Sequence, residues 1–404
     1  MSLASFNLWM IASLMATTSL FAQNCTQNCT KGCPQNSQQQ QQQQRQQICK
    51  PAKCGFSQAP QQPCTPAYNA PAEINVGIEG DVDFFVSGSF IYWQPLQDNM
   101  VVGTIFDNPQ PNLVTTYQNA TNGQLFEANS LELDYKYKPG FQVTLGMNLQ
   151  DDDWVGYGEY TRVHGTHSTS SNGPAGGAGV VSTTDTDNGE IYSSVSGKFT
   201  CNLDFADAIL ERVYYVGKNL AIHTAFGGRG AWITESFLTS YQGGTTSTPG
   251  TASSITLKYT ANNIIERVHS WGVGPRIGTE LDWNLGAGIR YFGDAFVDLL
   301  YTSYKVQHKS NPTIVVTNAG ISTTKTISIA NLDKVQTLRA HIDTEMGFGW
   351  GIYLNDSSWH IDLSASYGFQ VFFNQNMFTS STLIPNYSGN LYIHGLTATA
   401  RFDF

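Results

Sequence analysis

The chain has 404 residues, of which only 13% are charged, against about 25% in an ordinary soluble protein. Acidic residues outnumber basic ones by 31 to 21, and the net charge of −10 argues against a nucleic-acid-binding protein. Hydrophobic residues reach 41% without an apolar run of about 18 residues beyond the amino terminus, which excludes a bundle of membrane helices and leaves a β-rich chain with 49 aromatic residues.

The amino terminus has the pattern of an export signal. The stretch from Leu8 to Phe21 is apolar and ends in small residues around Ala22, although no Lys or Arg precedes it. A signal peptide is therefore predicted over residues 1–22, with a short buried helix as the alternative.

Residues 23–79 are predicted to form a disordered periplasmic tail rich in glutamine and cysteine. The tail contains the run Gln38–Gln44, several prolines and few large hydrophobic residues, so it buries too little apolar surface to fold. Six of the seven cysteines lie in it: Cys25, Cys29, Cys33, Cys49, Cys54 and Cys64. In an exported protein these residues are disulfide candidates, within the tail or between chains. Free thiols and a metal site are the alternatives, but the spacing is not that of a zinc site and no histidine is near.

Period-two alternation dominates residues 80–404. Phe141 and Leu145 point to one side of a predicted strand, while Gln142 and Thr144 point to the other. The same pattern is found at 270–283, 337–350 and 359–371. Alternation of this kind is typical of strands with one apolar and one polar face.

Three features favour a transmembrane barrel over a β-sandwich, which also alternates. Many predicted strands have about 14 residues or more, against about 5–6 in globular proteins. Trp271 and Trp283 bracket an apolar face and are separated by roughly 28 Å along the membrane normal in a tilted strand, close to the apolar band of about 25 Å in barrels. Short turns at 150–153, 217–219, 284–288 and 354–358 alternate with long stretches near 95–130, 165–190, 239–253, 307–331 and 373–387.

The sequence therefore predicts an all-β fold, an antiparallel transmembrane β-barrel of about 10–16 strands over residues 80–404. Ten strands are expected at about 81–94, 131–149, 154–164, 191–216, 220–238, 254–283, 289–306, 332–350, 358–372 and 388–404. An even number places both termini on the periplasmic side. Segments longer than a crossing are expected to protrude as ribbons or to hide a further hairpin, for which 95–130 also has room.

The last strand also alternates. Phe404, Phe402, Ala400, Ala398 and Leu396 share one face. A final strand that ends in Phe resembles the assembly signal of bacterial outer-membrane barrels, so Phe402 and Phe404 are predicted to engage the barrel assembly machinery. The alternative is an ordinary edge strand.

Seven short motifs follow one another in order between about residues 80 and 404. They are Asp83–Trp93, Lys138–Asn148, Gly158–Arg162, Gly230–Trp232, Trp271–Arg276, Leu363–Gln370 and His394–Phe404. Together they resemble the major outer membrane porin family of the legionellae and chlamydia-like bacteria. The resemblance implies a pore-forming protein in outer-membrane lipid, a homo-oligomer such as a trimer, that passes small hydrophilic solutes. In chlamydial relatives cysteine cross-linking stiffens the envelope, and by analogy disulfide-linked envelope proteins are expected partners of the tail.

In a porin the inward side chains set size and charge selectivity. By parity, the candidates for the lumen are Arg229, Arg276, Glu280, Asp282, Arg339, Asp343, Glu345, Asp362 and Arg401. Alternatively, these residues pair across neighbouring strands and fill a narrow barrel; ten strands favour filling, and 14 or more favour a channel. The acidic excess of the whole chain suggests a weak preference for cations.

Nothing in the sequence indicates an enzyme, a cofactor or a metal. His341 with Asp343, and His360 with Asp362, lie two residues apart and so roughly 7 Å apart, beyond hydrogen-bond reach unless another strand contributes. No nucleophile motif such as G-x-S-x-G accompanies them. Cys201 shares the apolar parity of its neighbours and is predicted to face lipid, with cross-linking as the alternative. The alternative to a porin is a structural or adhesive envelope protein, with loops contacting a partner and cysteines joining chains.

Overall fold

The computed structural model describes ten stretches of the chain: residues 82–106, 128–149, 154–172, 180–181, 191–216, 219–244, 247–249, 255–354, 359–378 and 389–404. The predicted signal peptide and the six cysteines of the tail lie outside these residues. Within the described stretches, no helix has the length and hydropathy needed to cross a membrane.

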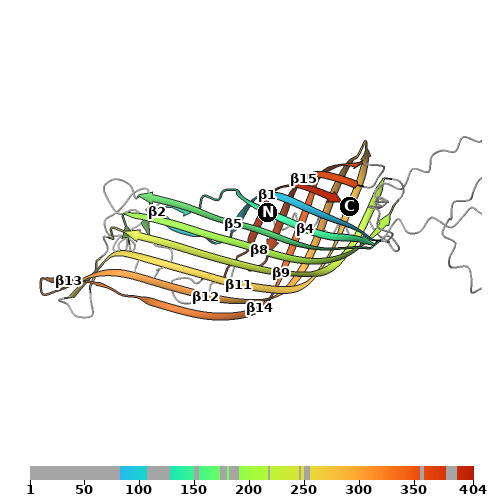
Figure 1. The fold of residues 1–404 in the computed structure, drawn as a ribbon. Coiled ribbons are helices and arrows are strands. Elements are labelled where there is room, and N and C mark those ends of the chain that lie inside the picture. The colour runs from blue at the N-terminus through green and yellow to red at the C-terminus, as the bar shows by residue number, and fades with distance from the viewer. Residues whose placement is uncertain are drawn as a thin grey trace, which may run out of the picture. The chain divides into compact units, whose positions relative to one another are not determined.

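Ten antiparallel strands form a closed barrel (Figure 1). In order around the barrel they are β1 (Val82–Gln97), β4 (Lys138–Leu149), β5 (Trp154–Asn172), β8 (Ser194–Tyr215), β9 (Leu220–Gln242), β11 (Ile255–Gly286), β12 (Ile289–Asn318), β14 (Ile329–Leu354), β15 (Trp359–Phe372) and β16 (Leu391–Asp403). The pairing of β1 with β16 closes the ring. The predicted all-β antiparallel barrel is confirmed at the lower end of its range, and each expected strand matches one of these ten.

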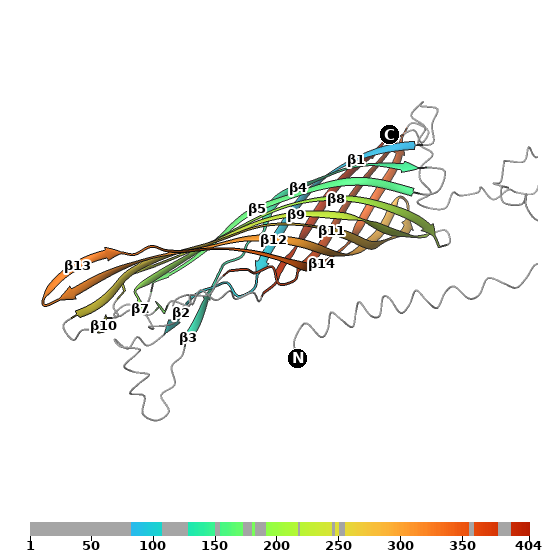
Figure 2. The same cartoon turned by 90° about the horizontal axis from the view of Figure 1, so that it is seen from below.

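Six further strands lie beside the barrel wall or extend it. A separate four-stranded sheet contains β2 (Val101–Phe106), β3 (Ala128–Glu132), β6 (Val180–Val181) and β7 (Ile191–Tyr192). The hairpin for which the stretch 95–130 has room is therefore present as β2 and β3, in a sheet separate from that of the barrel wall. Two short strands, β10 (Ser247–Pro249) and β13 (Ile321–Thr326), pair with the ends of β11 and β12 (Figure 2).

Three of the predicted long connections, 165–190, 239–253 and 307–331, are shorter than the sequence predicts, because paired strands continue into them. Most of the stretch 307–331 belongs to β12, β13 and β14, and β5 runs to Asn172. With 32 and 30 residues, β11 and β12 far exceed a membrane crossing of about 9–11 residues. They form the predicted ribbon, paired out to Ile255 and Asn318, and the burial of β12 still alternates as far as Ile314.

Of the four predicted short turns, the one at 284–288 lies wholly within the described residues, whereas 150–153 and parts of 217–219 and 354–358 lie outside them. Between β11 and β12, Ala287 and Gly288 have φ of 55° and 80°. Two successive residues with positive φ are the requirement of a tight type I′ hairpin turn, whose twist matches that of paired strands. The predicted turn at 284–288 is thus confirmed in place.

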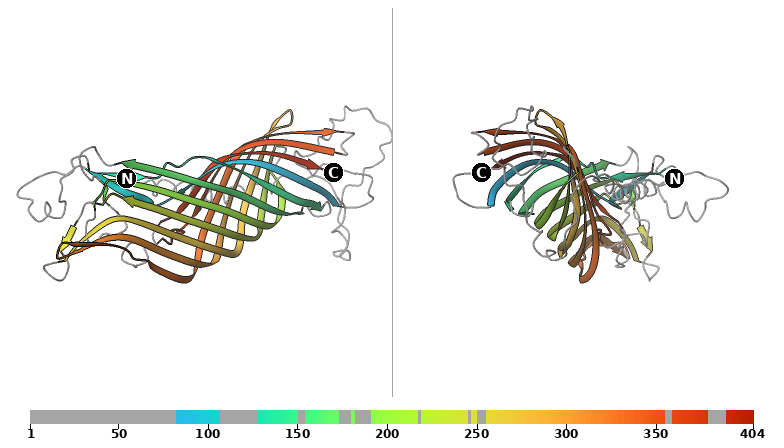
Figure 3. Two further views of the ribbon diagram at one scale, coloured as in Figure 1. Left: turned by 60° about the vertical axis from the view of Figure 1, so that its left-hand side comes forward. Right: turned by 90° about the vertical axis from the view of Figure 1, so that its right-hand side faces the viewer.

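The outer face of the barrel is apolar. Trp271 and Trp283 are 46% and 52% exposed, in keeping with aromatic residues at the two edges of an apolar band. Leu396 and Phe404 also face outward, whereas Asp403 of the same strand is buried. The strands cross the barrel obliquely (Figure 3, left), as closure of a sheet requires.

The prediction that Cys201 faces lipid is wrong. Cys201 is fully buried and packs inside the barrel with Phe199 and Phe205. On this part of β8 the outward residues are polar, among them Asn202 and Asp204. In this part of the barrel the outward side chains are accessible to solvent, and the inward ones pack against one another. The alternate apolar residues of β8 therefore mark the inner face of the barrel here.

One glycine position tests the close packing of the wall. A Cβ added at Gly274 would lie 2.0 Å from the Leu299 carbonyl oxygen. Gly274→Ala is therefore expected to lower the free energy of unfolding by about 1–3 kcal/mol. Urea unfolding followed by tryptophan fluorescence measures this. The control is Gly158→Ala, where the nearest atom would be 3.8 Å away and no comparable loss is expected; equal losses would contradict the prediction.

Candidate functional site

A polar cavity of about 270 Å³ lies inside the barrel and is lined by side chains from all ten barrel strands. Eight of the nine residues that parity placed in the lumen line it: Arg229, Arg276, Glu280, Asp282, Asp343, Glu345, Asp362 and Arg401. Arg339 does not. Its guanidinium lies 3.3 Å from the Tyr304 hydroxyl and 3.3 Å from the sulfur of Met377, among more apolar neighbours. Whether these residues line a conducting path stays a prediction.

A charged belt (Asp207, Arg229, Arg276, Asp298 and Asp343) crosses the interior. Arg229 donates Nε and Nη2 to the two carboxylate oxygens of Asp207, at 2.8 and 2.6 Å. Arg276 donates to Asp298 at 2.9 Å and to Asp343 at 2.8 Å. Arg229 on β9 also lies 3.5 Å from Asp343 on β14, although β11 and β12 separate these strands in the wall. The belt therefore ties opposite parts of the barrel together, and all five side chains are buried.

The two histidines that parity placed beside aspartates bind other aspartates. His341 lies 2.5 Å from Asp298, its register partner on β12, and His360 lies 2.9 Å from Asp403, its partner on β16. Each histidine thus pairs with an aspartate on the neighbouring strand, because the aspartate two positions away on its own strand is beyond hydrogen-bond reach. The His341 ring is fully buried, with its centre 3.9 Å from that of Phe372, which leaves a substrate no access to it.

An apolar plug fills the interior on the side of the long connections. We define it as the non-wall residues Met100, Val102, Leu133, Met377 and Phe378, all buried. They belong to one apolar cluster with wall residues that include Trp93 and Phe205, and these two also line the cavity. The plug therefore directly adjoins the cavity.

Polar contacts anchor the plug to the wall. The Tyr241 hydroxyl donates to the Val102 carbonyl at 2.7 Å, and the Tyr304 hydroxyl donates to Gln375 at 2.8 Å. Tyr135, between β3 and β4, donates to the Gln97 carbonyl at 3.0 Å. Burial raises the pKa of the Tyr135 hydroxyl well above its ordinary value, so it remains a hydrogen-bond donor. Nothing in the alternation of the strands indicated these inserted segments.

Residues 81–404 match the family model described as the Legionella pneumophila major outer membrane protein precursor. The chain belongs to this family. The name of the family and the closed barrel both indicate the same location. The protein lies in the bacterial outer membrane. The family suggested by the seven sequence motifs is thus confirmed.

Other comparisons add little to the family assignment. No curated protein matches the chain significantly. Among solved structures, the Escherichia coli outer membrane protease OmpT is 7% identical with a TM-score of 0.34, covering 80% of this chain and 96% of its own. The Ralstonia pickettii toluene transporter TbuX is 8% identical with a TM-score of 0.25, covering 83% and 92%. The Acinetobacter baumannii outer membrane channel DcaP is 10% identical with a TM-score of 0.13, covering 80% and 96%. Likeness at this level carries no information about activity.

Proposed function

We propose that this member of the major outer membrane protein family is a narrow, non-enzymatic channel for small hydrophilic solutes and ions, closed by the apolar plug in the conformation described here. Ten strands and the ion pairs of the charged belt favour a filled interior, but a polar cavity lined by all ten barrel strands lies within it, and this observation carries the proposal. A barrel that served only as a wall would gain more stability from an apolar interior, because buried ion pairs often contribute less than hydrophobic packing. The plug residues lie between barrel strands, including Val102 on β2 of the separate sheet, so the plug can move without breaking the pairing of the barrel strands.

The charges of the cavity favour cations. Nine carboxylates line it, against four arginines. This local excess is stronger evidence than the net charge of the chain, because loops contribute to the latter. Rings of acidic side chains are a common device of cation-selective pores.

In planar bilayers we therefore expect small stepwise conductances with a reversal potential that shows cation selectivity. Glu159→Gln, which removes one carboxylate of the cavity lining, should reduce that selectivity. The matched control is Glu132→Gln on β3, which is outside the cavity lining. Anion selectivity of the wild type would reverse the charge argument, and absence of any conductance together with no swelling of liposomes in graded sugars would contradict a channel.

A structural or adhesive role is the second candidate. The extended hairpin around β13 exposes Ile321, Ile327, Ile329 and Leu332, of which Ile321 is 73% exposed. Isolated exposed apolar residues are common, but four on one ribbon offer a contact surface. The proposed cross-linking through the tail cysteines is tested by non-reducing gel electrophoresis. Cysteine-dependent ladders of oligomers would support cross-linking, and their absence would contradict it.

A further inference from the structure

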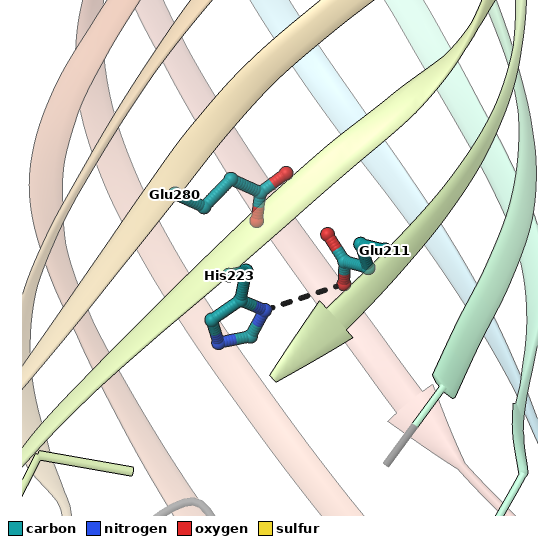
Figure 4. Close-up of side chains that lie close together, drawn as sticks. All are labelled: Glu211, His223 and Glu280. Carbon is teal, nitrogen blue, oxygen red and sulfur yellow. Dashed lines mark hydrogen bonds and ion pairs between the residues drawn. The ribbon is translucent and has the colours of Figure 1, made fainter. Parts of the chain in front are cut away.

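Three strands bring one histidine and two glutamates together on the inner wall, near the short turns (Figure 4). His223 on β9 and Glu280 on β11 are direct register partners. Glu211 on β8 is the diagonal neighbour of His223, because it pairs with Ala225 two residues further on. Direct and diagonal partners on one face of a sheet lie within side-chain reach of each other. The register alone therefore holds the three side chains side by side.

The spacing of these side chains suits a metal ion better than a hydrogen bond. One ligand atom from each of Glu211, His223 and Glu280 lies within 4.8 Å of the other two. His223 Nδ1 is 3.4 Å from Glu211 Oε1, longer than the usual hydrogen bond of about 2.9–3.0 Å. Tetrahedral ligands at about 2.0 Å from a cation are separated by about 3.3 Å.

Glu211 supplies the second observation. Its side chain is only 7% exposed, and its Oε2 atom has no hydrogen-bond partner. In Figure 4 this oxygen is the one turned away from His223, on the side of Glu280. A buried carboxylate oxygen without a partner is costly unless something binds it.

The charges around the cluster also call for a cation. Asp282 lies 3.4 Å from His223 Nε2, so three carboxylates surround one imidazole. The nearby Arg290 is shared between Asp282 and Asp362, at 3.4 and 3.0 Å. It therefore does not neutralise the two glutamates.

Glu280 is positioned from outside the cluster. The Tyr157 hydroxyl on β5 donates to Glu280 Oε1 at 3.1 Å. Ligand carboxylates in metal sites are commonly oriented by such outer hydrogen bonds.

We propose that Glu211, His223 and Glu280 form a binding site for one divalent transition-metal ion, with Zn²⁺ as the best fit, open to the cavity on its fourth side. An imidazole with two carboxylates suits Zn²⁺, whereas Mg²⁺ and Ca²⁺ prefer oxygen ligands alone. No motif in the sequence indicates this site, and no metal is predicted, because its ligands are 12 and 57 residues apart and meet only through the strand register.

The test uses the full-length protein in detergent, stripped with a chelator and with its accessible thiols alkylated so that tail cysteines do not bind zinc. Equilibrium dialysis against ZnCl₂ is expected to give one Zn²⁺ per chain. Glu211→Gln, His223→Gln and Glu280→Gln should each weaken binding by about 100-fold or more, because even outer-shell changes cost 10–100-fold. The matched controls are Glu345→Gln, which changes another residue of the cavity lining, and His360→Gln, which changes the histidine bound to Asp403; both lie outside the cluster and should leave binding unchanged.

A second measurement needs no variant. Zn²⁺ should protect His223, but not His360, from modification by diethyl pyrocarbonate, as mapped by mass spectrometry. The proposal is overturned if the wild type binds no Zn²⁺, if Mg²⁺ competes equally, or if Zn²⁺ leaves the modification of His223 unchanged. A folded Glu211→Gln variant that binds Zn²⁺ as the wild type does would also overturn it.

Discussion

Arg229→Met is expected to lower the free energy of unfolding by about 3–5 kcal/mol, the cost of breaking a buried ion pair from one side. Arg229 is the member of the charged belt that joins β9 to β14 across the interior. Methionine fills much of the same space, so the loss comes mainly from charge. Asp207 would keep a buried carboxylate whose two hydrogen bonds from Arg229 are gone.

Reversible urea unfolding from lipid vesicles, followed by tryptophan fluorescence, measures this loss. The control is Arg267→Met, which removes an exposed arginine from β11 and should change stability by less than about 0.5 kcal/mol. In the double variant Arg229→Met, Asp207→Leu, an apolar pair replaces the ionic one, so part of the loss should be recovered. A loss no larger than that of Arg267→Met would show that the belt contributes nothing to stability.

The strand pattern of this barrel could be predicted from sequence because lipid and lumen impose opposite demands on alternate residues. Leu396 and Asp403, for example, lie on opposite faces of β16 and differ in exposure as their parity requires. Where the strands leave the lipid band, that demand ends. All residues of β13 are exposed, so hydrogen bonds to β12 hold it in place and no periodicity reveals it.

The sequence predicts which side chains face the interior but not which of them pair with each other. Parity places Arg276 and Asp343 in the lumen, yet their 2.8 Å contact reaches across β12, which separates their strands, and depends on how the barrel curves. The same parity argument failed at Cys201, because it assumed that an apolar face always meets lipid. The plug escaped prediction for a related reason: Met377 and Phe378 follow a strand end and are apolar without alternating.

Phe378→Ala is expected to raise the open probability of the channel by about 100-fold or more. Phe378 is buried in the plug, with its ring 6.3 Å from that of Phe199 and 6.1 Å from that of Phe237. Removing a buried phenylalanine costs about 3–5 kcal/mol, and each 1.4 kcal/mol changes an equilibrium about tenfold. The loss falls on the closed arrangement, because a displaced plug no longer makes these contacts.

Single-channel recordings in planar bilayers test this directly, since they separate open probability from conductance. Phe141→Ala serves as the control: it removes an aromatic ring from the lipid-facing side of β4 and should leave open probability unchanged. Phe378→Leu, which keeps an apolar side chain, should fall between the two. If Phe378→Ala folds and its open probability equals that of the wild type, the plug is not the barrier. The charged belt would then be the barrier that closes the lumen. In that case Arg229→Met should increase conductance, because methionine removes the contact that crosses the lumen.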